Sequence, residues 1–159
     1  MKKSYVAFLV ALICALPIPL FSQVFDIGSA TGSNSAFDYP APFGRYYYGS
    51  RHQFVYTVAE LQAAGLTSAT AFDSLGFNVT AVNAADNHAR FTIRVGNVAN
   101  ANLASGWIDT TLLTRVYRNN AGVQPVVGWN MFKLDEPFVW DGTSDLVVET
   151  LDLLHHKNA

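Results

Sequence analysis

Cysteine is nearly absent from this chain of 159 residues, since Cys14 is its only one. Cys14 falls within residues 1–22, which we predict to be a secretory signal peptide, so the mature chain would have neither cysteine nor disulfide. Export without disulfides points to a bacterial exterior rather than to a small disulfide scaffold. The core must therefore be held by burial of apolar side chains.

The predicted signal has Lys2 and Lys3, followed by an apolar run over residues 5–20. Pro17 and Pro19 interrupt the end of this run, which is short for a membrane span. We therefore expect a secreted or outer cell-surface protein, with cleavage after Ser22 and no transmembrane segment after signal removal.

Charge is also scarce. Charged residues make up 14% of the chain and apolar residues 50%. Loss of Lys2 and Lys3 would take the basic residues from 10 to 8, against 12 acidic ones. A mildly acidic domain argues against nucleic acid or anionic membranes as partners.

The sequence lacks a recognisable catalytic motif. His52, His88, His155 and His156 are the only histidines, and none lies in a nucleophile motif. Adjacent carboxylates on a strand, such as those at 135 and 136, point to opposite faces and predict no glycosidase pair. We therefore expect a protein that is not an enzyme.

What is present is a series of short, aromatic-rich β-prone segments separated by turn residues. This pattern predicts an all-β fold, an antiparallel sandwich of jelly-roll type with seven or eight strands. The expected strands are Val24–Ile27, Arg45–Tyr48 and Gln53–Tyr56 as a hairpin or two edge strands around a turn at Gly49–Arg51, Ser74–Thr80 paired antiparallel with Phe91–Val95, Leu112–Tyr117, and two within Gly128–Glu149.

The segment Gly128–Glu149 reads as strand, corner, turn and strand. Phe132 and Leu134 share one face of its first strand, and Leu146 and Val148 share one face of its second. We expect these two strands to lie in different layers of the core.

One short helix is expected at residues 59–64. Thr57 and Glu60 fit a capping box, in which each side chain bonds to the backbone of the other residue. Gly65 then supplies the left-handed residue that ends a helix.

These elements form one predicted domain, residues 23–150, with residues 151–159 as a tail or truncated end that adds nothing to the core. The last strand, Leu146–Thr150, would then be an exposed edge, where a missing continuation or a partner could add the next strand.

The chain resembles a β-sandwich domain of modular secreted or surface proteins of the Bacteroidetes. The resemblance spans about residues 27–149, and its most specific block is Trp140 to Ser144, in the sequence WDGTS. It is supported by the segments Gly128–Leu134, Leu146–Glu149, Tyr56–Leu66, Phe77–Val79 and Phe91–Gly96.

The resemblance implies a non-catalytic module, placed beside fibronectin type III-like modules and upstream of a C-terminal type IX secretion sorting domain. Such relatives continue with further strands and a sorting domain that this sequence does not contain, which favours a fragment or truncated product. Its partners would be a protein or a glycan at the cell surface, or neighbouring modules if the chain is a fragment.

Two candidate sites emerge from residue type. Tyr47, Trp107 and Trp129 could bind a ligand by stacking on the apolar faces of sugars, although aromatic rings also serve packing. Asp135, Asp141 and Asp145 could bind calcium, although acidic residues at a turn also bond to their own backbone. No cofactor is expected, with calcium as the alternative.

The functional prediction is accordingly a non-catalytic module with a structural or adhesive role in a bacterial extracellular protein. The alternative is a carbohydrate-binding accessory module of a secreted hydrolase.

Overall fold

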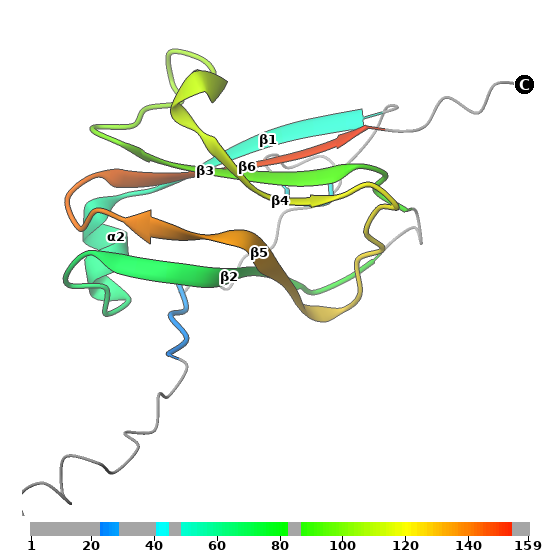
Figure 1. The fold of residues 1–159 in the computed structure, drawn as a ribbon, viewed down its shortest axis with the longest axis horizontal. Coiled ribbons are helices and arrows are strands. Elements are labelled where there is room, and N and C mark those ends of the chain that lie inside the picture. The colour runs from blue at the N-terminus through cyan, green and yellow to red at the C-terminus, as the bar shows by residue number, and fades with distance from the viewer. Residues whose placement is uncertain (1–22, 29–40, 45–48, 83–86, 154–159) are drawn as a thin grey trace, which may run out of the picture.

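The computed structural model describes residues 23–28, 41–44, 49–82 and 87–153. Its strands form two antiparallel sheets that face each other as a sandwich (Figure 1). The four-stranded sheet has the order β1 (Gly49–Tyr56), β6 (Asp145–Leu153), β3 (Phe91–Val98) and β4 (Thr114–Asn119). The two-stranded sheet contains β2 (Thr70–Val79) and β5 (Gly128–Trp140).

The prediction of an all-β antiparallel sandwich with one short helix is confirmed. The strand order is that of a jelly roll in which two strands between β3 and β4 are missing from the smaller sheet. In their place, residues 99–113 form a loop that ends in the 3-10 helix η1 (Thr110–Leu112). This loop is central to the candidate site.

The core lies between the two sheets. The inward faces of β3 and β6 meet the inward faces of β2 and β5, and aromatic rings fill the space between them. Phe91 and Phe132, for example, have ring centroids 5.3 Å apart. The buried side chains of this core are Leu61, Leu66, Phe77, Phe91, Ile93, Val95, Val116, Phe132, Leu134, Trp140, Leu146 and Val148.

The helix α2 (Val58–Ala63) has the predicted capping box. The Glu60 carboxylate accepts from the Thr57 N–H at 2.8 Å, and the Thr57 hydroxyl accepts from the Glu60 N–H at 3.3 Å. Gly65 follows with φ +101° and buried Leu61 holds the helix on the core. The expected helix bounds are shifted by one residue.

The two strands of residues 128–149 are confirmed, and they do lie in different layers. β5 belongs to the smaller sheet and β6 to the larger one. The turn between them is closed by Trp140, whose indole N–H donates to the Ser144 carbonyl at 2.7 Å.

The expected pairing of Ser74–Thr80 with Phe91–Val95 is wrong. β2 pairs with β5, and β3 pairs with β4 and β6. Strict alternation shows that one face of a strand is buried, and this holds for strands in either sheet of a sandwich. Alternation therefore does not show which strand pairs with which.

The N-terminal strand predictions also need correction. Residues 24–27 form no strand, although Phe25 and Ile27 pack against the core. Gly49 to Arg51, expected as a turn, belong to β1, while Arg45–Tyr48 lie outside the described residues.

The C-terminal expectations are corrected as well. β6 continues to Leu153, and Asp152 within it is buried, so residues 151–153 belong to the sheet rather than to a tail. β6 is also not an edge, because β1 and β3 pair with it on either side. Residues 154–159 lie outside the described part of the chain.

In the described part of the chain, no helix is long and apolar enough to cross a bilayer. The predicted signal peptide, residues 1–22, lies outside it.

Candidate binding face around Glu149

The candidate site lies on the outer face of the four-stranded sheet, the side turned away from the core. Antiparallel register places Gln53, Glu149, Arg94 and Arg115 in one row across β1, β6, β3 and β4. The adjacent row contains Arg51, Leu151, Thr92 and Arg118. Residues directly opposite each other share a face, so these two rows form one surface, which we call the Glu149 face.

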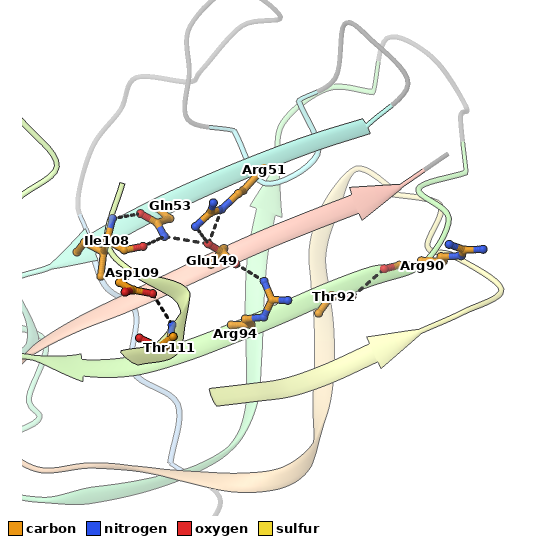
Figure 2. Close-up of polar contacts among 9 residues, drawn as sticks. All are labelled: Arg51, Gln53, Arg90, Thr92, Arg94, Ile108, Asp109, Thr111 and Glu149. Atoms are coloured by element: carbon orange, nitrogen blue, oxygen red, sulfur yellow. Dashed lines mark hydrogen bonds and ion pairs between the residues drawn. The ribbon is translucent and has the colours of Figure 1, made fainter. Parts of the chain in front are cut away.

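Glu149 is fully buried at the centre of this face, between two arginines from the neighbouring strands (Figure 2). Its Oε2 accepts from Arg51 Nε at 2.7 Å and from Gln53 Nε2 at 2.8 Å, and its Oε1 accepts from Arg94. A buried carboxylate is stable only when charge and hydrogen bonds compensate its lost hydration. These three donors supply that compensation.

Gln53 also connects Glu149 to the loop of residues 99–113. Its side-chain amide donates to the Ile108 carbonyl at 2.9 Å and accepts from the Ile108 N–H at 2.8 Å (Figure 2). Both backbone groups of one loop residue are thus satisfied by a side chain from β1. The loop is fixed to the sheet next to Trp107.

Apolar packing reinforces this attachment. Ile108 and Leu113 bury themselves against Val147 on the outer side of β6, forming a second, smaller core. Gly96 permits the close approach, because a Cβ at this position would lie 2.5 Å from the Leu112 carbonyl oxygen. The loop between β3 and β4 is therefore packed onto the outer face of their own four-stranded sheet.

Trp107 projects from this fixed loop with 60% of its surface exposed. The guanidinium carbon of Arg51 lies 4.7 Å from the centre of its ring, a cation–π contact. Because Arg51 is itself held by Glu149, the ring rests on an ordered support. One ring face is occupied by Arg51, and much of the indole stays open to solvent.

The structure places Trp107 and Trp129, two of the three predicted ligand-binding aromatics, on different surfaces. Trp129 lies on β5 opposite Asn78, 53% exposed, on the outer side of the two-stranded sheet. It is therefore on the opposite surface of the sandwich from Trp107. Tyr47 lies outside the described residues.

Two of the three predicted calcium ligands accept hydrogen bonds from backbone N–H groups. Asp141 Oδ1 accepts from the Thr143 and Ser144 N–H groups at 2.8 and 2.7 Å, and the first of these bonds leads in lowering the pKa of Asp141 to about 2. Asp145 accepts from the backbone N–H groups of Val58 and Ala101, and Asp135 is exposed on β5. Among the described residues, no three metal-ligating side chains gather at one point.

A second polar cluster joins Ser50, His88 and Asp152. His88 Nδ1 lies 2.8 Å from Asp152 Oδ2, while the Ser50 hydroxyl donates to Asp152 Oδ1. Burial favours the protonated form of Asp152, but the bonds from His88 and Ser50 outweigh it and lower its pKa. The carboxylate stands between serine and histidine, so His88 is not placed to take the Ser50 proton as a catalytic base would.

The sequence interpretation selected Trp107 but not Arg51, Gln53, Arg94 or Glu149. The sequence did contain a sign of this cluster, since Glu149 directly follows the apolar run Leu146–Val148, and a charge inside a buried strand requires partners. The identity of those partners depends on which strands flank β6.

No family model, curated protein or solved structure was found to match this chain. The resemblance to Bacteroidetes surface modules therefore stays a prediction.

Proposed function

We propose that this protein is a non-catalytic, adhesive module exported by a bacterium, and that the Glu149 face is its ligand-binding surface. The observation that carries the proposal is the way in which Trp107 is held at the surface. A loop clamped by Gln53 presents the ring, and Arg51, itself held by Glu149, supports it.

This arrangement favours a binding role over simple exposure. Ordering a large side chain at a surface before binding reduces the entropy lost when a ligand arrives. Tryptophan and arginine are both enriched in binding surfaces, because each side chain combines apolar area with polar groups.

The second candidate, a carbohydrate-binding accessory module of a hydrolase, is favoured by the exposed area of Trp107. Aromatic rings pack against the apolar faces of sugars while their polar edges stay hydrated. The cluster of Ser50, His88 and Asp152 adds no support for an enzyme, because its hydrogen bonds do not follow the order serine, histidine, carboxylate.

The test compares Trp107→Ala with Trp129→Ala, since both remove a half-exposed indole but from opposite surfaces. The purified protein is applied to arrays of glycans and of extracellular proteins. We expect binding that Trp107→Ala abolishes and Trp129→Ala preserves. Binding that survives Trp107→Ala would refute the Glu149 face as the ligand surface, and a glycan array without signal would remove the carbohydrate candidate.

A further inference from the structure

We infer that the Glu149 face binds an acidic polysaccharide, one whose sugars carry carboxylate groups. The inference rests on the proposed function, because it names the ligand class of the same surface.

The chain as a whole is acidic, but this face is basic. Arg51, Arg94, Arg115 and Arg118 all lie in its two rows, while Glu149 supplies a carboxylate at its centre. Asp109, exposed at the start of η1, adds a second carboxylate on the loop that packs on this face (Figure 2). Four positive charges against two negative ones leave a local charge of +2, whereas the full chain has −2.

The arginines differ in what they can offer a ligand. Arg51 and Arg94 use part of their donors to compensate Glu149. Arg115 and Arg118 are exposed on β4, and of these Arg118 donates through Nε to Asn120. A guanidinium has five N–H donors in a fork that fits carboxylate groups, so donors remain for an anionic ligand.

A polysaccharide suits this surface better than an acidic peptide. A carboxylated sugar needs a cation for its charged group and an apolar partner for its ring. Arg51 and Trp107 present both within one contact, their groups 4.7 Å apart. A run of acidic side chains would require the arginines alone and would give the ring no role.

The experiment measures binding of four probes to the full chain: polygalacturonate, its methyl-esterified form, poly-glutamate and a neutral galactan. The key variant is Arg115→Gln/Arg118→Gln, which leaves the contacts of Glu149 intact. Lys133→Gln is the control, because it removes one positive charge from the exposed side of β5. Urea unfolding verifies that each variant is folded.

We expect polygalacturonate to bind at least about tenfold more tightly than its methyl ester, since charge-assisted hydrogen bonds are lost on esterification. The double arginine variant should weaken binding about tenfold and Lys133→Gln should not, while added salt should weaken the wild type through screening. Trp107→Ala should weaken polygalacturonate binding but leave any poly-glutamate binding unchanged.

Three outcomes would overturn the inference. Equal or tighter binding of poly-glutamate would indicate an acidic protein as the ligand. Binding of the galactan or the ester that depends on Trp107 but not on Arg115 and Arg118 would indicate a neutral glycan and leave the proposed function standing. Absence of binding to every probe would refute the acidic polysaccharide, while the array comparison of Trp107→Ala and Trp129→Ala would still test the proposed function separately.

Discussion

The side-chain amide of Gln53 forms two hydrogen bonds to the backbone of Ile108, one donated at 2.9 Å and one accepted at 2.8 Å. Both partners are buried, and they lie 55 positions apart in the sequence. This pairing has the geometry of a short piece of β-ladder, formed by a side chain instead of a strand. It couples the loop of residues 99–113 to the four-stranded sheet.

Gln53→Ala should therefore destabilise the fold and release the loop. The substitution leaves the Ile108 N–H and C=O buried without these bonds, and each unsatisfied group carries a desolvation penalty, so we expect a loss of about 2 kcal/mol in the free energy of unfolding. Urea unfolding measures the loss, and faster hydrogen exchange of the Ile108 amide reports on the loop.

Gln62→Ala is the control for this prediction, because Gln62 is exposed on α2 and alanine favours helices. It should change stability by less than about 0.5 kcal/mol. If Ile108 exchange in Gln53→Ala remained as slow as in the wild type, the loop would have to be held by the packing of Ile108 and Leu113 alone.

Glu149→Gln should be more severe. The amide has nearly the shape of the carboxylate but no charge, so Arg51 and Arg94 would face each other without compensation. Breaking a buried ion pair from one side is strongly destabilising, and we expect a loss of about 3 kcal/mol in the free energy of unfolding. The control, Glu136→Gln, changes an exposed residue on β5 and should have little effect.

A double-mutant cycle tests whether the charge itself is responsible. Arg94→Gln should cost less in the Glu149→Gln background than in the wild type. In that background the carboxylate that Arg94 compensates is already gone, and Arg94 only faces the positive charge of Arg51. Strictly additive losses would show that Glu149 and Arg94 stabilise the sheet independently, against the network described above.

The elements that could be predicted from the sequence are those decided by nearby residues. The capping box of Thr57 and Glu60 spans a single turn, and the alternation around Phe132 follows from the two-residue period of a strand. Both were found where expected. In the same way, Asp141 at the turn before β6 uses the backbone bonds that its turn residues favour.

The elements that could not be predicted depend on non-local pairing. Alternation in β2 shows which side chains are buried, but β5, its true partner, lies some fifty residues further along the chain. The Glu149 face has the same origin, since Arg51, Arg94 and Glu149 come from three strands. Whole-chain charge argued against nucleic acid and anionic membranes as partners, but a net charge does not show that four arginines gather on one face.

Gly96→Ala should displace the loop of residues 99–113 from β3, where Leu112 and Leu113 lie close to the glycine. The new Cβ would lie 2.5 Å from the Leu112 carbonyl oxygen and 2.7 Å from Leu113 Cδ2, so backbone as well as side chain must move. Overpacking of this kind typically costs between about 1 and 3 kcal/mol, and we expect about 2 kcal/mol in urea unfolding.

Gly76→Ala provides the matched control in β2. Its Cβ would meet mainly the sulfur of Met131, 2.3 Å away, but that side chain is exposed and flexible. The expected loss is below about 1 kcal/mol, because the methionine can rotate aside. If Gly76→Ala destabilised the protein as much as Gly96→Ala, the loss would come from adding a methyl group to a strand. It would then not come from displacing the loop that packs on Gly96.

The lowered pKa of Asp141 should make the stability of the fold fall at low pH. Hydrogen bonds from the Thr143 and Ser144 N–H groups favour its ionised form and lower its pKa to about 2 in the fold, from 3.8 ordinarily. A carboxylate whose pKa is lowered by folding contributes its full stabilisation at pH values above its pKa in the unfolded chain. This contribution is lost as the pH falls through its pKa in the folded protein. The affected window is therefore between about pH 4 and pH 2.

Asp141→Asn isolates this contribution, because asparagine can still accept the turn hydrogen bonds but does not titrate. Between pH 4 and pH 2, the urea midpoint of the variant should fall less than that of the wild type, whereas Asp135→Asn, an equal charge change on β5, should follow the wild type. Parallel acid profiles for Asp141→Asn and the wild type would show that the turn bonds contribute equally with or without the charge, and that acid sensitivity arises elsewhere, for example at Asp152, whose pKa is also lowered.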